Sequence, residues 1–425
     1  MGQFHAVFIV VASMLGTGIL TTTGFMSARL GGPLEVLAVW VAGALLALLG
    51  ALSYGAIMRR YPQSGGEAVL IHRFYSPAWG YATGLLSFLV AFASSNAAAA
   101  MALSAYFWVG VRGGDLLSGA QASSKPTAIA AVILMTALHT LRHERGMAVQ
   151  TLLAVLKLTL LGAVTVFGLH AIDWQATPLL HSAWQGHASP GDWALCMLFV
   201  VFTYSGWNAA IYAASEFRQP ERTVPRAMLI GAGLIITLYF LLNIALVANL
   251  SVHDLAGVEA VVALLVSKLF GAGATSAFSL LVSIVLLSSI GVSAFTGPRV
   301  LYGLIEARQG HAAPQGIQAP TRLIWLQGLA SIVLILTGSF EEIMALMGVF
   351  IGICPVVTVL GMYGGRWQAE PPPAWVRFGV APAYILFSSL LVMVSIWTNP
   401  KSALFVVILI AVALVQTVRN KRIAA

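Results

Sequence analysis

The chain has 425 residues, of which 59% are hydrophobic and 8% are charged, and its mean hydropathy is +0.90. No soluble core hides so much apolar surface, so this composition excludes a water-soluble globular protein and predicts an integral membrane protein. The net charge of +8 is divided among many short segments, which argues against a nucleic-acid partner and for charges that orient the chain in a membrane.

Apolar segments of roughly the 20 residues that a bilayer-spanning helix needs repeat along the whole chain. We predict an all-α fold of twelve transmembrane helices, joined mostly by short loops and without a soluble domain. The predicted spans begin near Val7, Leu34, Pro77, Thr127, Met147, Trp193, Ala227, Ala274, Leu323, Glu342, Phe378 and Ser402, and the last ends near Val418. Because no Lys or Arg precedes the first span and no small-residue cleavage site follows it, we expect it to stay in the mature protein.

Basic residues set the predicted orientation, since Lys and Arg collect on the cytoplasmic side of a membrane. With both termini inside, most of them fall in cytoplasmic segments. The exceptions are Arg29, Arg112, Lys125, Lys268 and Lys401, which fall outside, and Lys157, which falls within a span. We therefore expect a multi-pass protein of the cytoplasmic membrane with both termini in the cytoplasm.

Glycines interrupt the first predicted span within residues 13–20, where Gly16 and Gly18 flank Thr17. Lipid offers no hydrogen bonds, so a broken helix persists at membrane depth only where it lines a cavity or binds something. This stretch is therefore a candidate substrate site.

A second interruption, in residues 202–208, lies midway along the sixth span and contains Gly206. Paired interruptions at equivalent places in two halves are typical of transporters built from inverted repeats, with the site near the membrane midplane. We predict a five-helix repeat in residues 1–171, a second, inverted repeat in residues 172–365, and helices 11 and 12 with the tail in residues 366–425. The alternative is that these glycines only let helices pack closely.

The chain resembles the amino acid-polyamine-organocation superfamily of permeases over essentially its whole length. Residues 16–19 resemble that superfamily's break in helix one, and residues 61–67 resemble its cytoplasmic loop after helix two. Residues 202–208 with 215–227 are similar to its helix-six break and the following loop, and residues 297–303 to the end of its helix eight. In the superfamily, an acidic residue often follows the helix-six aromatic residue. Here that position is Asn208.

The resemblance implies a five-plus-five inverted repeat with broken helices 1 and 6, and an amino acid as substrate. Out of water, both the carboxylate and the ammonium of an amino acid need partners. Free N–H groups at the start of the outer half of helix one suit the carboxylate, and open carbonyls near Ser13 and in residues 202–205 suit the ammonium. The candidate substrate-binding residues are Ser13, Gly16, Thr17, Gly18, Ile19, Asn96, Phe202, Tyr204, Ser205, Gly206 and Trp207.

The predicted substrate side chain is uncharged and apolar, because no Asp, Glu or Arg lies deep within a predicted span to pair with a charge. Phe202 and Trp207 are the expected wall residues, with Asn96 as a polar lining group. The helix-one and helix-six motifs most resemble the superfamily branch that exports hydrophobic amino acids such as methionine, leucine, isoleucine and valine. The alternative is proton-driven uptake or exchange of small neutral amino acids.

Lys157 is the ionisable side chain that falls deepest within a predicted span. An intramembrane charge is a functional hypothesis by default, and from mid-span the nearest membrane surface is about 15 Å away. The resemblance implies that this amine couples protons to transport, with partners in the helix-one backbone near Ser13 and in the hydroxyls of Ser288 or Ser289. The alternative is a static internal tether.

Other classes of function find no support in the sequence. Cys196 and Cys354 lie in separate spans without metal-ligand spacing, so we expect them to pack as small apolar residues. A membrane enzyme needs clustered His, Asp or Glu at depth, and a channel needs a filter loop or a charged pore helix. We expect no enzyme activity, metal or cofactor, and the predicted partners are a small amino acid, protons and the lipid bilayer.

Overall fold

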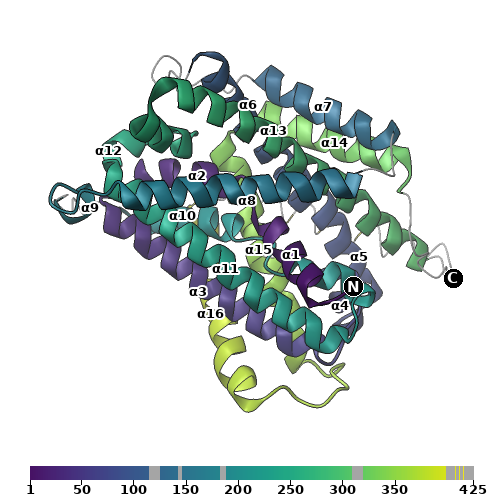
Figure 1. Ribbon diagram of the computed structural model, residues 1–425. Coiled ribbons are helices and arrows are strands. Elements are labelled where there is room, and N and C mark those ends of the chain that lie inside the picture. The colour runs from purple at the N-terminus through teal and green to yellow at the C-terminus, as the bar shows by residue number, and fades with distance from the viewer. Residues whose placement is uncertain are drawn as a thin grey trace.

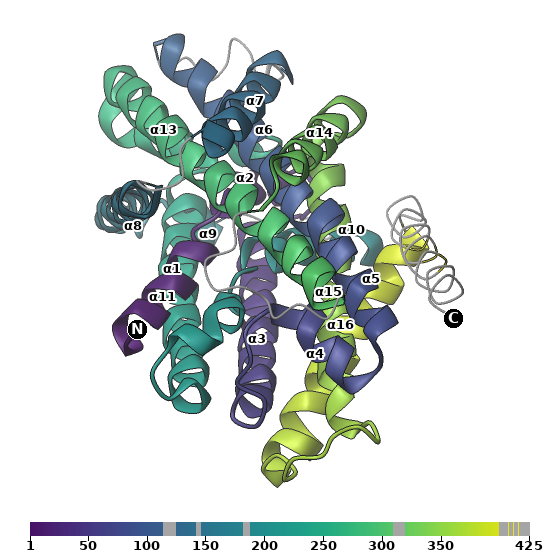
Figure 2. The same ribbon diagram turned by 90° about the vertical axis from the view of Figure 1, so that its right-hand side faces the viewer.

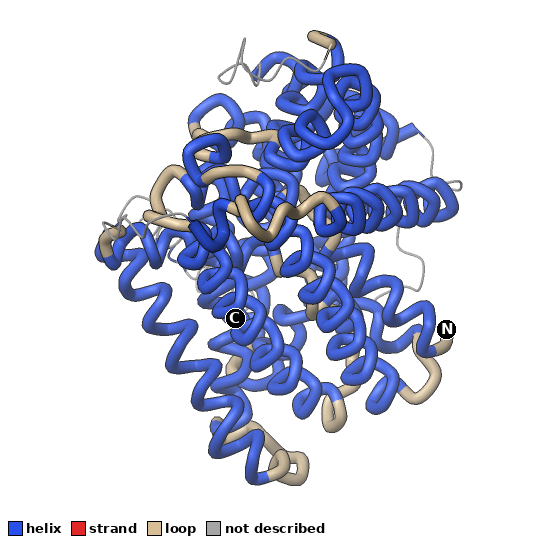
Figure 3. The backbone as a smooth tube through the Cα atoms, turned by 60° about the vertical axis from the view of Figure 1, so that its left-hand side comes forward, coloured by secondary structure: helices blue, strands red, loops and turns tan. Residues whose placement is uncertain are grey.

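The structure, a computed structural model, describes residues 1–113, 125–141, 146–181, 188–308 and 319–398, together with residues 407, 411 and 415. Within these ranges the chain forms helices and connecting turns and contains no strand (Figure 3). Eight helical segments of this part are long and apolar enough to cross a membrane. Two further helices of this part are apolar but shorter. The predicted all-helical membrane protein is confirmed at this level.

The helices follow the predicted spans closely in most of the chain. The first half contains α1 (Gln3–Met14), α2 (Gly18–Ser27), α3 (Pro33–Met58), α4 (Gly66–Phe74), α5 (Pro77–Leu86), the π-helical η1 (Ser87–Phe92), α6 (Ala93–Val111), α7 (Lys125–Leu141) and α8 (Gly146–His170). The second contains α9 (Pro178–His181), α10 (Pro190–Thr203), η2 (Ala209–Glu216), α11 (Pro220–Asn249), α12 (Val252–Leu255), α13 (Val261–Arg308), α14 (Thr321–Thr337), α15 (Phe340–Leu360), η3 (Gly361–Tyr363), η4 (Val376–Val380) and α16 (Ala381–Thr398). The twelfth predicted span lies almost wholly outside the described residues.

Two helices begin earlier than predicted. α11 starts at Pro220, whereas the predicted span begins near Ala227. The first two turns are polar and contribute nothing to the hydropathy signal, so the prediction missed them. α13 starts at Val261, because an apolar segment precedes the predicted eighth span and joins it across Gly271, whose φ of 78° breaks the helical geometry. The hydropathy pattern thus locates the apolar part of a helix better than its ends.

Local sequence explains several helix starts. Proline occupies the first turn of α3, α5, α10 and α11, where the missing N–H costs no hydrogen bond. Ser189 and Ser339 cap α10 and α15, each in a reciprocal capping box with the acidic residue three positions on. These capped ends lie on the predicted outer side.

The long helix α13 packs along α6, and α11 packs on both α3 and α1. Small residues let α13 lie close to α6, since the side chains of Ala97, Ala98, Ala99 and Ala100 of α6 are all buried. Figure 1 shows α3 and α11 lying next to each other, and Figure 2 shows α13 crossing the molecule beside α6. The short helices α1, α2 and α10 lie among these long ones.

Candidate functional site

The first helix break separates α1 from α2. α1 ends at Met14, and Leu15 leaves the helical conformation with a ψ of 65°. The Gly16 N–H donates to the Met14 carbonyl at 2.6 Å, and α2 begins at Gly18. The first N–H groups of a helix have no acceptor within it. The break therefore presents the amides at the start of α2 next to the carbonyls at the end of α1.

The second break separates α10 from η2. α10 ends at Thr203, and the Ser205 N–H donates to the Phe202 carbonyl at 3.0 Å. Gly206 has a φ of 97°, a left-handed conformation that favours glycine. The chain then continues through Asn208 into the 3-10 helix η2.

The two breaks touch at two places, and a glycine makes each contact. A Cβ atom at Gly206 would lie 2.8 Å from the carbonyl carbon and oxygen of Ser13. A Cβ atom at Gly18 would lie 2.1 Å from Oγ1 of Thr203. Any larger residue at these positions forces the breaks apart, so the close approach explains the glycines.

A small cavity of about 50 Å³ lies between the breaks. Six residues predicted as substrate-binding line it, and Ser289, predicted for proton coupling, also does. Its lining consists of Ser13, Met14, Gly16, Thr17, Gly18, Ser95, Ala99, Phe202, Thr203, Ser205 and Ser289. Met14, Ser95, Ala99 and Thr203 were not predicted. Ser95 and Ala99 lie four residues apart, and this spacing of two small residues on one face of a helix could have indicated them.

The other predicted residues lie away from the cavity lining. Trp207 packs edge-on against Tyr54, with 5.0 Å between the ring centroids. Tyr204 stacks on Tyr239 at 5.8 Å. Asn96 is 1% exposed, and its Oδ1 has no hydrogen-bond partner among the described residues. Ile19 and Gly206 adjoin the cavity through their neighbours only, and the binding roles of all these residues stay predictions.

Lys157 of α8 is 5% exposed and reaches the first break. Its Nζ donates to the Leu15 carbonyl at 2.7 Å and to Ser289 Oγ at 2.7 Å. The predicted partners were the backbone near Ser13 and the hydroxyl of Ser288 or Ser289. The observed partners are the carbonyl of Leu15, two residues after Ser13 in the same break, and the hydroxyl of Ser289. The Ser288 hydroxyl instead donates to the Val285 carbonyl at 2.6 Å. Since Ser289 also lines the cavity, a single hydroxyl separates the amine from it.

Tyr239 of α11 is a contact that sequence analysis missed. Its hydroxyl donates to the Met14 carbonyl at 2.6 Å, and its ring stacks on Tyr204 in the second break. It thus occupies the carbonyl of the last residue of α1, and Lys157 occupies the next carbonyl, that of Leu15. No motif surrounds Tyr239, so only the fold brings it to the site.

The hydroxyls of the cavity fall into two groups. Those of Ser95, Thr203 and Ser289 have hydrogen-bond partners in the protein. The hydroxyls of Ser13, Thr17 and Ser205 make no hydrogen bond to another residue within the described ranges. A polar ligand in the cavity would therefore meet three uncommitted hydroxyls, all of them at the helix breaks.

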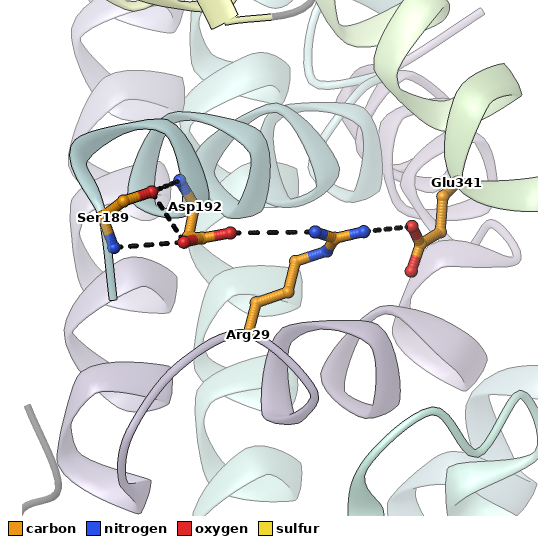
Figure 4. Close-up of polar contacts among 4 residues, drawn as sticks. All are labelled: Arg29, Ser189, Asp192 and Glu341. Atoms are coloured by element: carbon orange, nitrogen blue, oxygen red, sulfur yellow. Dashed lines mark hydrogen bonds and ion pairs between the residues drawn. The ribbon is translucent and has the colours of Figure 1, made fainter. Parts of the chain in front are cut away.

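A charged cluster joins the predicted outer ends of three helices. Arg29, just after α2, lies between Asp192 at the start of α10 and Glu341 at the start of α15 (Figure 4). Its distance to Asp192 is 3.7 Å, and Ser189 also holds that carboxylate, with Oγ at 2.7 Å. Arg29 lies eleven residues beyond Gly18, so the cluster is about 16 Å from the cavity along α2.

Metal-binding groups do not accompany this site. In the described ranges no three or more His, Cys, Asp or Glu side chains gather where they would hold a metal ion. Cys196 and Cys354 are buried free thiols. The cavity itself carries no acidic or basic side chain in its lining.

Comparisons with known proteins identify a family and relatives that match most of the chain. A family model described as amino acid permease matches residues 1–421. The serine/threonine exchanger SteT of Bacillus subtilis (strain 168) is 25% identical over 72% of this chain and 68% of its own length. The b(0,+)-type amino acid transporter 1 of Mus musculus is 24% identical over 94% of this chain and 83% of its own. The large neutral amino acids transporter small subunit 2 of Mus musculus is 25% identical over 94% and 76%.

Proposed function

Because this chain belongs to the amino acid permease family, we propose that it is a secondary transporter of neutral L-amino acids across the cytoplasmic membrane. The observation that carries the proposal is the cavity between the two helix breaks. Substrate would sit there with its carboxylate at the first amides of α2 and its ammonium among the hydroxyls and carbonyls of the breaks.

The chemistry of the cavity supports a neutral substrate. Its lining has no carboxylate or guanidinium to pair with a charged side chain, and an unpaired charge out of water is costly. Met14, Ala99 and Phe202 form an apolar part of the wall. We therefore favour amino acids with apolar side chains, such as methionine, leucine, isoleucine and valine.

The volume of the cavity supports a second candidate, small neutral amino acids such as alanine and serine. A space of about 50 Å³ holds roughly four water-sized groups. That matches the ammonium, Cα and carboxylate of an amino acid, whereas a leucine side chain requires Phe202 or its neighbours to move.

Proton coupling through Lys157 is part of the proposal. Loss of its proton would weaken its hold on the Leu15 carbonyl and on Ser289, and both contacts adjoin the cavity. The competing role is a tether that keeps α8 on the break throughout the cycle. Export as the physiological direction rests on the sequence resemblance. The twelve spans rest on the repeated apolar segments, the cytoplasmic termini on the distribution of Lys and Arg, and the inverted repeats on the paired interruptions together with the resemblance.

Counterflow in proteoliposomes tests the proposal. Vesicles loaded with one unlabelled amino acid should accumulate the same labelled amino acid from outside, and vesicles without protein should not. Comparing leucine, methionine, alanine and serine ranks the two candidate classes, and arginine and glutamate serve as charged controls. Equal counterflow of the charged amino acids would contradict the assignment. An imposed pH difference should drive net accumulation if protons are coupled.

A further inference from the structure

Glu67 is a buried carboxylate on the predicted cytoplasmic side that the proposed transport mechanism does not use. It lies in the first turn of α4, outside the candidate spans, and is 5% exposed. Three neutral groups donate hydrogen bonds to it: Tyr212 at 2.6 Å, Tyr54 at 3.4 Å and Asn208. These donors come from η2, from α3 and from the turn that follows the second break.

No cation accompanies this carboxylate, since the ion pairs within the described ranges do not include it. The titratable groups that face it are the hydroxyls of Tyr54 and Tyr212, the thiol of Cys354 in α15 and the hydroxyl of Tyr384 in α16. Tyrosine and cysteine are uncharged near pH 7 when unperturbed. Glu67 is therefore the group of this cluster whose charge changes with pH.

The same region holds η2 in place at further points. The Ser64 and Ser215 hydroxyls lie 2.6 Å apart, and the Ser215 N–H donates to Ser64 Oγ at 2.8 Å. A Cβ atom at Gly66 would lie 2.2 Å from the Tyr212 ring, so the loop backbone and the ring are in close contact. Figure 2 shows α4 at the same end of the bundle as the lower turns of α3 and α16.

This attachment bears directly on the cavity. Asn208 comes three residues after Ser205, which lines the cavity, and directly after Trp207, which packs on Tyr54. If η2 leaves α3 and α4, the inner wall of the cavity moves with it. The contacts of Glu67 therefore attach η2 and the turn before it to α3 and α4, three residues from the cavity lining.

We propose that Glu67 is a positioning residue whose proton controls how readily η2 separates from α3 and α4, so that the inner face of the cavity opens in a pH-dependent way. This proposal rests on the proposed function in one respect, that the cavity is the transport site. The contacts between residues 64–67 and residues 208–216, which we call the latch, do not depend on that function.

The direction of the pH effect follows from linkage. Burial raises the pKa of Glu67, and the hydrogen bonds from Tyr212, Asn208 and Tyr54 oppose that shift without cancelling it. Opening exposes the carboxylate to water and returns its pKa to the ordinary range. The closed form thus binds the proton more tightly, so acidification favours closure and opening releases a proton to the cytoplasmic side.

Hydrogen exchange followed by mass spectrometry tests the latch on the full chain. After correction for the intrinsic rate, peptides that cover residues 64–72 and 208–217 should be better protected at about pH 5.5 than at about pH 7.5, by up to tenfold for each unit of pKa shift. Glu67→Gln mimics the protonated form, so these peptides should be protected equally at both pH values. Glu35→Gln changes another buried acid, at the far end of α3, and should behave as wild type.

Two further variants keep the test decisive. Tyr212→Phe removes a donor that favours the ionised form, so the midpoint of the pH effect should rise. Glu67→Gln combined with Asn208→Asp returns one carboxylate to the cluster and should restore pH dependence. Exchange in Glu67→Gln that follows pH as in wild type would overturn the latch, as would a double variant that stays insensitive to pH. Binding of labelled leucine and alanine to the same preparations reports the proposed function separately, since its absence in wild type overturns transport but not the latch.

Discussion

Two glycines allow the two helix breaks to lie in contact, because they have no side chain. Gly206 lies against the Ser13 backbone and Gly18 against Thr203, so each break forms part of the wall of the other. Gly16 differs, because a Cβ atom there would have only the Met14 carbonyl oxygen nearby, at 3.8 Å, and would point into open space. The three glycines therefore serve the site in different ways, and substitutions should separate them.

Gly16→Ala should leave the fold intact and reduce binding. The added methyl group enters a cavity of about 50 Å³ instead of colliding with the backbone. A methyl group in a fitted pocket is worth about 1–3 kcal/mol, so affinity for leucine should fall by at least about fivefold, and affinity for alanine by less. Equilibrium binding of both labelled amino acids measures this. Gly233→Ala, on α11 with open space around it, is the matched control and should bind as wild type.

Lys157→Met should separate coupling from transport. Methionine keeps the apolar stem but removes the ammonium from the Leu15 carbonyl and Ser289. Accumulation driven by a pH difference should disappear, while exchange at equal pH persists, because exchange needs no net proton movement. Flux assays in proteoliposomes under the two conditions compare them. Accumulation against a gradient that survives in Lys157→Met vesicles would make the lysine a tether.

At the level of elements, the sequence predicted both helix breaks, because glycine and small polar residues that interrupt an apolar run leave backbone groups that lipid cannot satisfy. The sequence did not predict which residues of other helices contact the breaks. Tyr239 carries no motif, and its contact with Met14 depends on how α11 packs against α1. Trp207 was predicted as a wall residue. Its ring packs on Tyr54 of α3, outside the cavity lining, and its role in binding stays a prediction.

Arg29→Gln should loosen the outer ends of α2, α10 and α15. The three charged side chains are about one-third exposed, so the cluster is worth about 1 kcal/mol or less and its loss should change opening by up to about fivefold. The readout is the reaction rate of Ser205→Cys with an external thiol reagent, in a background that carries Cys196→Ala and Cys354→Ala. The rate should rise in Arg29→Gln and in wild type at high salt. Arg112→Gln, also on the predicted outer side, is the control, and equal rates in both variants would show that the cluster does not restrain the outer face.

Over the whole molecule, hydropathy predicted most helix starts because each apolar run must match the thickness of a bilayer. It failed for α11 and α13, where the helix continues beyond the apolar run or joins a second one. The arrangement of the site depends on long-range packing that no local pattern contains. The cavity joins residues from α1, α2, α6, α10 and α13, and Lys157 of α8 donates a hydrogen bond to Ser289 in its lining.

The central claim is that an amino acid binds between the two helix breaks, and equilibrium binding to Gly18→Val tests it most directly. Valine at this position collides with Thr203 and covers the first amides of α2, whereas Gly233→Val places the same side chain in open space. Purified wild type, Gly18→Val and Gly233→Val are compared with labelled leucine and with labelled alanine, and thermal unfolding confirms that each is folded. We predict that Gly233→Val binds as wild type does and that Gly18→Val loses binding of both amino acids. A folded Gly18→Val that binds either one as tightly as wild type would contradict the site.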